Sequence, residues 1–195
     1  MTREIIGIDV DDVVADHAAA FAEYSNVNHG TNISRDTYTE RWDVLWNVYD
    51  RAEIERRAAE FHTPESAANY VVIDGAQEAL ETLTKTYTLA VVTARPKEIV
   101  GATHDWLETH FKGVFSEVHF VPIWHPDNTL TKADICRKIK ADYLIDDLVK
   151  HCNIAAQAGI KALLFGDYLW NRSDKVDDTV TRCKDWAAVL EYFDA

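Results

Sequence analysis

The stretch Glu4-Ile5-Ile6-Gly7-Ile8-Asp9-Val10-Asp11-Asp12 opens the chain with an apolar run that ends in acids. A short apolar run bounded by polar residues is typical of a buried strand. Two later runs have the same form: Tyr87 to Val92 is followed by Thr93, and Tyr143 to Ile145 is followed by Asp146-Asp147. Because ligands bind beyond the carboxyl ends of the strands in an open parallel sheet, we expect these acids and the Thr93 hydroxyl to share one crevice.

Helical and strand patterns alternate regularly along the chain beyond Thr93. This alternation predicts an α/β fold, a Rossmann-like doubly wound parallel sheet with right-handed crossovers. The expected helices cover residues 96–111, 132–139, 148–158 and about 184–192, and the expected strands cover residues 118–121, 143–145 and 160–165.

The interval between the first two strands is far longer than the dozen or so residues that a parallel crossover needs. A helical pattern follows Asp11 and stops at Gly30, and a charged helix is expected over residues 50–62. We therefore predict a small helical cap over residues 15–73, inserted into a core domain of residues 1–14 and 74–195. The helix that returns to the core, over residues 74–84, has Asp74 as its expected N-cap.

Charge and cysteine content exclude several classes of protein. The 195 residues include 33 acids and 20 bases, a formal charge of −13, which disfavours binding to nucleic acid polymers and to anionic membranes. Cys136, Cys152 and Cys183 form no C-x-x-C pair and fit a reducing compartment. No stretch reaches the ~18 apolar residues of a membrane span, and the first apolar run is too short for a signal peptide. We expect a cytoplasmic protein. Its oligomeric state stays open, and a homodimer is one of the alternatives.

The residues expected in the crevice suit phosphoryl transfer through a carboxylate. One carboxylate attacks phosphorus, and a second acid protonates the leaving alkoxide and then activates water. Asp9 and Asp11 are the candidates, although Asp11 and Asp12 could instead cap the helix that follows them. The adjacent acids Asp146 and Asp147 are costly at a strand end unless a cation binds them, which predicts a Mg²⁺ site.

The order and types of these residues resemble the haloacid dehalogenase-like (HAD) hydrolase superfamily. The phosphatases of this superfamily carry Asp-x-Asp, Ser/Thr, Lys and an acidic pair, in that order along the chain. The resemblance implies a HAD-like fold in which Asp9 is the nucleophile and Asp11 the general acid/base. It also implies that Lys132 neutralises the nucleophile and the phosphate.

The segment after the second strand is the expected phosphate-binding site. The Thr93 hydroxyl and the N–H groups of Ala94 and Arg95 precede a helix, whose N-terminus favours anions. Pro96 fits the first turn of that helix. For the Arg95 side chain, a contact with phosphate and a surface salt bridge are both open.

The resemblance also implies a ligand set for Mg²⁺. Asp9, the backbone carbonyl of Asp11 and one of the acidic pair would bind the cation, with phosphate and water completing an octahedron. Asp146 is the favoured ligand of the pair because it lies at the strand end, and Asp147 would act through water.

Within the superfamily, the chain is most similar to the 5'(3')-deoxyribonucleotidase group. The similarity rests on Asp9 to Asp16 (Asp-x-Asp-x-Val-x-Ala-Asp), on the short helical cap, on Ile145-Asp146-Asp147 and on the segment Phe165 to Arg172 followed by Trp186. It implies a Mg²⁺-dependent phosphatase that acts on deoxynucleoside monophosphates. The alternatives are a phosphatase for another small phosphate ester, of a sugar or an amino acid, and a phosphoacceptor or binding protein without turnover.

Aromatic residues in the cap are candidates for substrate contacts. Trp42, Trp46 and Tyr49 are spaced as one helical face, on which a base could stack. The alternative is that two of the three pack the cap onto itself. His17 lies one turn past the acids and either lines the pocket or belongs to the helix surface.

Overall fold

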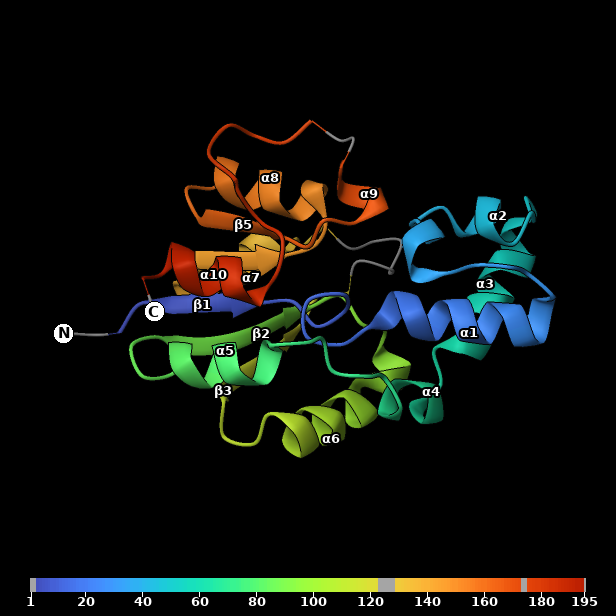
Figure 1. Ribbon diagram of the computed structural model, residues 1–195, viewed down its shortest axis with the longest axis horizontal. Coiled ribbons are helices and arrows are strands. Elements are labelled where there is room, and N and C mark those ends of the chain that lie inside the picture. Colours follow the sequence, from blue (N-terminus) through green and yellow to red (C-terminus); the bar gives the residue numbers. More distant parts are fainter. Residues whose placement is uncertain (1–2, 123–128, 173–174, 195) are drawn as a thin grey trace.

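The apolar runs form the central strands of one parallel sheet in the computed structural model, which describes residues 3–122, 129–172 and 175–194 (Figure 1). Within these ranges the sheet is six-stranded in the order β3-β2-β1-β4-β5-β6, so that the strand directly before Asp9 lies at its centre. Each neighbouring pair is parallel. The strands are β1 (Ile5–Ile8), β2 (Thr88–Thr93), β3 (Phe115–Phe120), β4 (Tyr143–Asp146), β5 (Lys161–Phe165) and β6 (Thr181–Cys183).

Alternate residues of the central strands face two separate apolar layers. Ile6 and Ile8 pack with helices on one face. Gly7 points to the other, where an added Cβ would lie 3.2 Å from the Cys136 sulfur, so the glycine allows a helix to pack closely on β1. The first layer holds α5 (Ala76–Leu83), α6 (Val100–His110) and α10 (Trp186–Tyr192), and the second holds α7 (Lys132–Ile139) and α8 (Val149–Gln157). The predicted doubly wound α/β fold is confirmed.

A group of helices lies beyond the carboxyl ends of the strands, on the side opposite the two chain termini (Figure 1). Asp16 caps the first of them, since its side chain accepts a hydrogen bond from the Ala19 N–H, and Gly30 ends it with φ 65°. A bridge between Ala15 and Val72 brings the two ends of the segment together. The helices are α1 (His17–His29), η1 (Arg35–Thr37), α2 (Trp42–Leu45), α3 (Arg51–Phe61) and α4 (Pro64–Ala68). We call this segment the cap; its exact limits at residues 15 and 73 remain our proposal.

Several details differ from the prediction, including the start of β3 at Phe115 rather than at residue 118. The N-cap of α5 is Gly75, with φ 79°, and not Asp74. The helix expected over residues 96–111 is divided into η2 (Lys97–Ile99) and α6. Strand β6 was not expected, because its three residues are too few for a period-two pattern.

The described residues contain no helix with the length and apolar character needed to cross a lipid bilayer.

Trp186 joins α10 to the loop that carries Asp11 and Asp12. Its side chain is 1% exposed, and its indole N–H donates to the Val13 carbonyl at 3.0 Å. We expect Trp186→Ala to lower the free energy of unfolding by about 3–5 kcal/mol, measured by urea denaturation, because it leaves a cavity and an unpaired carbonyl. Val27→Ala, at a side chain that is 77% exposed, is the control and should change it by less than about 0.5 kcal/mol. A loss below about 1 kcal/mol in Trp186→Ala would contradict this role.

Candidate active site

The predicted core residues of the site meet at the carboxyl edge of the sheet. Asp9 directly follows β1, Thr93 ends β2, Asp146 ends β4 and Lys132 begins α7. Their strands are neighbours in the order β2-β1-β4, which explains how residues up to 137 positions apart in the sequence come together.

Lys132 lies buried between two carboxylates. Its Nζ is 2.6 Å from Oδ2 of Asp9 and 2.7 Å from Oδ2 of Asp146. A capping box between Thr131 and Asp134 fixes the start of α7, and hence the position of this lysine. Burial would lower the pKa of Lys132, but the charges of Asp146 and Asp9 outweigh it and raise the pKa above its usual range. The ammonium is therefore a permanent charge at the centre of the site.

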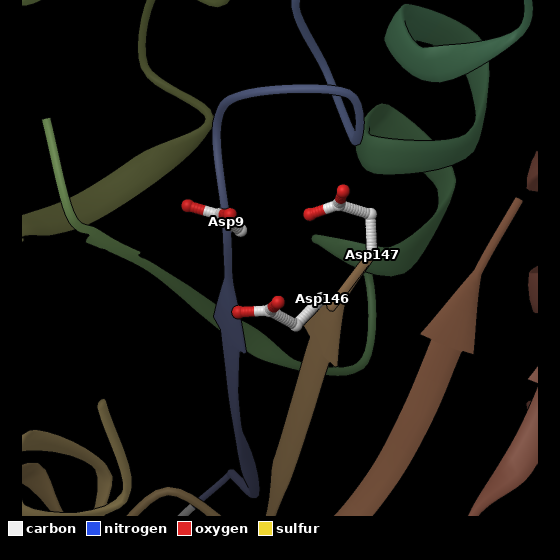
Figure 2. A group of neighbouring side chains, drawn as sticks. All are labelled: Asp9, Asp146 and Asp147. Carbon is white, nitrogen blue, oxygen red and sulfur yellow. The ribbon is translucent and has the colours of Figure 1, made fainter. Parts of the chain in front are cut away.

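Asp9 and the acidic pair form a group that can hold a cation. One ligand oxygen each of Asp9, Asp146 and Asp147 lies within 4.8 Å of the others, and the three side chains converge from β1 and β4 (Figure 2). Burial raises the pKa of Asp9 to about 6, against the opposing charge of Lys132. Oδ1 of Asp9 is buried and has no hydrogen-bond partner among the described residues. An unpartnered carboxylate oxygen among other carboxylates fits the oxygen ligands that Mg²⁺ prefers.

The two adjacent acids differ in their partners. Oδ2 of Asp146 accepts from the ammonium described above, Oδ1 accepts from the Leu148 N–H at 2.9 Å, and Nδ1 of His151 lies 3.3 Å from each oxygen. For Asp147, Oδ2 accepts from the indole N–H of Trp170 at 2.7 Å. Burial and the charge of Asp146 raise the pKa of Asp147 well above its usual range. These partners favour Asp147 over Asp146 as a direct ligand, the reverse of the order expected from the sequence.

Asp11 is held by a guanidinium that the sequence did not connect with it. Nη2 of Arg95 is 2.7 Å and Nε 3.0 Å from Oδ1 of Asp11, and Nη1 donates to the Thr103 hydroxyl at 3.2 Å. Burial would raise the pKa of Asp11, but Arg95 outweighs it and lowers the pKa to about 2. The Arg95 side chain is buried, so its salt bridge with Asp11 is not the surface salt bridge that was one of the two alternatives, and that alternative is wrong. A contact of Arg95 with phosphate stays a prediction.

The helix-capping alternative applies to Asp12 and not to Asp11. Oδ1 of Asp12 accepts from the Ala18 N–H at 3.0 Å, in the first turn of α1. Both carboxylate oxygens of Asp11 instead accept hydrogen bonds from Arg95.

The expected phosphate-binding segment follows β2. Thr93 is fully buried, and its hydroxyl accepts from the Arg95 N–H at 3.3 Å. Ala94 and Arg95 line the cavity above the acids, together with Pro96. Their predicted contacts with phosphate stay predictions.

Two cavities lie above the acids and share part of their walls. The smaller, about 80 Å³, is lined by Asp9, Asp11, Lys132 and Asp147. The larger, about 810 Å³, lies between α2, α3 and the segment that follows β2. Residues common to both linings are Glu40, Trp42, His62 and Pro96.

The cap aromatics divide between the cavity wall and the cap interior. Trp42 lines both cavities. Trp46 is 5% exposed, and its indole N–H donates to the Ser25 hydroxyl at 2.9 Å. The expected continuous helical face does not form, because α2 ends at Leu45 and Asn47 has φ 49°. Trp46 therefore belongs to the cap interior and not at the substrate, whereas Tyr49 is exposed and borders the larger cavity.

His17 borders the smaller cavity and is buried rather than on the helix surface. Its ring stacks on Trp42 at 6.1 Å, and Nδ1 lies 3.6 Å from Asp12. Burial would lower the pKa of His17, but the neighbouring carboxylates of Asp12, Asp11 and Glu40 together outweigh it and raise the pKa.

Several residues of the site were not predicted. Glu40, His62 and His151 line the smaller cavity, and Trp170 contacts Asp147. Glu40 lies in an irregular cap segment whose sequence shows no period, and His62 is the C-cap of α3. For Trp170 a signal existed, because it follows β5, the neighbour of β4 at the same edge of the sheet.

Comparison with known proteins supports the α/β fold described above and identifies a family. The family model described as 5' nucleotidase, deoxy (pyrimidine), cytosolic type C protein matches residues 3–193. No match was found among curated proteins.

Solved structures of HAD-like proteins resemble the chain over nearly its whole length. A haloacid dehalogenase-like hydrolase from Streptococcus pneumoniae has a TM-score of 0.72 at 14% identity, with 98% of each chain covered. A predicted phosphoglycolate phosphatase from Haemophilus somnus has a TM-score of 0.67 at 19% identity, with 99% of each covered. D,D-heptose 1,7-bisphosphate phosphatase from B. bronchiseptica, complexed with magnesium and phosphate, has a TM-score of 0.60 at 18% identity, with 97% of each covered. At these identities the likeness shows the fold alone.

Since the family match extends over residues 3–193, the chain belongs to the 5' nucleotidase, deoxy (pyrimidine), cytosolic type C family of HAD-like hydrolases and is a phosphoric monoester hydrolase.

Proposed function

We propose that the chain is a Mg²⁺-dependent, cytoplasmic 5'-nucleotidase that hydrolyses (deoxy)nucleoside monophosphates through an aspartyl-phosphate on Asp9. The observation that carries the proposal is the position of Asp9, next to Lys132 and the acidic pair and directly below the cavities under the cap. The family description adds the nucleotide, and its word "cytosolic" supports the compartment.

In the first step, a carboxylate oxygen of Asp9 attacks phosphorus, and the bond from phosphorus to the leaving oxygen breaks. Asp11 gives its proton to the leaving alkoxide. In the second step Asp11 takes a proton from water, whose oxygen attacks phosphorus, and phosphate leaves as the Asp9 carboxylate is restored. Asp11 can carry its proton only if its bond with Arg95 loosens, and a phosphate anion offers that guanidinium a competing partner.

Charge neutralisation decides whether the first step can occur. Two unit charges ~4 Å apart interact by about 4 kcal/mol at an effective dielectric constant of ~20, so a phosphate dianion beside ionised Asp9 faces repulsion of about 8 kcal/mol. Lys132 supplies one compensating charge, 2.6 Å from Asp9. Bound Mg²⁺, held by Asp9, the carbonyl of Asp11 and the acidic pair, would supply two more and orient the phosphate.

The larger cavity favours an uncharged leaving group. Four acids line it (Glu40, Asp43, Glu55 and Glu98), against Arg51 and His62, and the rest of its wall is aromatic and aliphatic. A nucleoside is uncharged, offers O–H and N–H donors to carboxylates, and has a flat base for an aromatic ring. A leaving group with a second negative charge, such as a carboxylate or another phosphate, would meet repulsion there. The phosphate ester of an uncharged sugar would also meet this condition, and it is the alternative.

A phosphate-release assay with Mg²⁺ over nucleoside monophosphates, sugar phosphates and phospho-amino acids tests this function. We expect the highest kcat/KM with a deoxynucleoside monophosphate. A preference for sugar phosphates or phospho-amino acids would exclude the nucleotidase while leaving the phosphatase intact.

The first prediction from the proposed function concerns the nucleophile. We expect Asp9→Asn to lower kcat by several orders of magnitude, because an amide cannot attack phosphorus. Asp11→Asn should also be slow, but should accumulate a phosphoenzyme from an activated ester, detected by acid quench and mass spectrometry. Near-normal turnover in Asp9→Asn would show that another group attacks.

The second prediction concerns the metal. We expect EDTA to abolish activity, Mg²⁺ to restore it, and Ca²⁺ to inhibit, since its bonds are longer and its geometry is looser. Asp147→Ala should raise the Mg²⁺ concentration needed for half-maximal rate. Full activity in EDTA would remove the cation from the scheme.

The third prediction concerns the cap. We expect Trp42→Ala to lower kcat/KM for a deoxynucleoside monophosphate by about 5- to 150-fold, the equivalent of about 1–3 kcal/mol of base stacking. Hydrolysis of a small aryl phosphate, which needs no contact with the larger cavity, should change little. Trp46→Phe, inside the cap, is the matched control. If the ratio of the two kcat/KM values stays constant in Trp42→Ala, Trp42 does not bind the leaving group.

A further inference from the structure

The segment after β5 contacts the acidic pair from the side. It contains α9 (Leu169–Arg172) and lies next to β4, since β4 and β5 are neighbours in the sheet. The indole N–H of Trp170 donates to Oδ2 of Asp147 at 2.7 Å. Nδ2 of Asn171, whose side chain is fully buried, donates to the Asp147 carbonyl at 3.1 Å and to the Phe165 carbonyl at 3.0 Å. Both the side chain and the backbone of Asp147 are thus held by α9.

The indole itself is held on a fixed platform. Trp170 stacks on Tyr168, with ring centroids 4.3 Å apart and an interplanar angle of 14°. The Tyr168 hydroxyl donates to the Asp12 carbonyl at 2.9 Å. Gly166, with φ 79°, is needed for this arrangement, because an added Cβ would lie 2.1 Å from the Tyr168 ring. The N–H that reaches Asp147 therefore has a defined direction.

A hydrogen bond of this kind matters more for Asp147 than for its neighbour. Both oxygens of Asp146 accept hydrogen bonds, from Lys132 and from the Leu148 N–H. Asp147 carries no such contact with a basic side chain in the described residues, although it is only 4% exposed. A donor to the ionised carboxyl stabilises the charge that a cation requires. Groups that hold metal ligands in this way typically change metal affinity by about 10- to 100-fold.

We propose that Trp170 is a positioning residue for Asp147: its indole N–H holds Oδ2, so that the other oxygen faces the cation together with Asp9. The role rests on the metal site of the proposed function. It does not depend on which phosphate ester is the substrate.

The test uses Trp170→Phe, which keeps a ring on Tyr168 and removes the N–H. Binding of Mg²⁺ alone to the full chain, measured by isothermal titration calorimetry without substrate, should weaken about 10-fold or more. With saturating Mg²⁺, kcat should return to near the wild-type value. Trp46→Phe also removes an indole N–H, the one bound to Ser25 inside the cap, and should leave the affinity for Mg²⁺ unchanged.

A double variant separates positioning from general loosening. In an Asp147→Ala background, Trp170→Phe should weaken Mg²⁺ binding no further, because the residue that it acts through is gone. If Trp170→Phe is less stable, the rise in its unfolding temperature on adding Mg²⁺ gives the same comparison. That rise should be smaller than in the wild type.

Two outcomes would overturn the proposal in different ways. Wild-type affinity for Mg²⁺ in Trp170→Phe, or equal weakening in the Asp147→Ala background, would remove Trp170 from the site and leave the metal in place. A wild-type chain that binds no Mg²⁺ would overturn the metal site itself, and this role with it.

Discussion

The ammonium of Lys132 between Asp9 and Asp146 is the interaction on which the site depends. Both carboxylates are nearly buried, and breaking a buried ion pair by removing one partner typically costs about 3–5 kcal/mol. The ammonium lies 2.6–2.7 Å from both acids and comes from the first residue of α7. This ammonium allows the ends of β1 and β4 to lie side by side with an acid on each. In the proposed mechanism the same charge offsets that of the phosphate.

The pKa values of Asp9 and Asp11 are shifted in opposite directions. Burial raises the pKa of Asp9 to about 6, whereas Arg95 lowers that of Asp11 to about 2. The proposed roles require Asp9 to be ionised and Asp11 to be protonated when substrate is bound, so the larger change concerns Asp11. A cation beside Asp9 lowers its pKa, and a phosphate that attracts Arg95 releases Asp11. In the proposed mechanism, ligand binding would therefore complete the reactive state by releasing Asp11 from Arg95.

Strand ends could be predicted from the sequence, but side-chain partners across the fold could not. Asp9, Thr93 and Asp146 follow apolar runs, and parallel topology alone places them at one edge. The partner of Asp11 lies 84 residues away in Arg95, and no local pattern connects them. The face expected from Trp42 to Tyr49 failed because Asn47 adopts a left-handed conformation that ends the helical repeat. The spacing of apolar residues predicts which side chains share a face only where a helix or strand continues for several turns or residues. The cap has few long helices.

An aromatic contact joins the cap to the segment that binds Asp147. The ring of Tyr38, from the cap, packs edge-on against Trp170 at 5.1 Å. The Tyr38 hydroxyl donates to Glu40 at 3.1 Å and accepts from the Trp42 indole at 3.0 Å, and both of these residues border the larger cavity. A leaving group that displaces Trp42 or Glu40 would therefore act on Tyr38, and through its ring on the indole that holds Asp147. Since coupling between two sites is reciprocal in free energy, occupancy of the metal site would in turn favour the cap arrangement that accepts the leaving group.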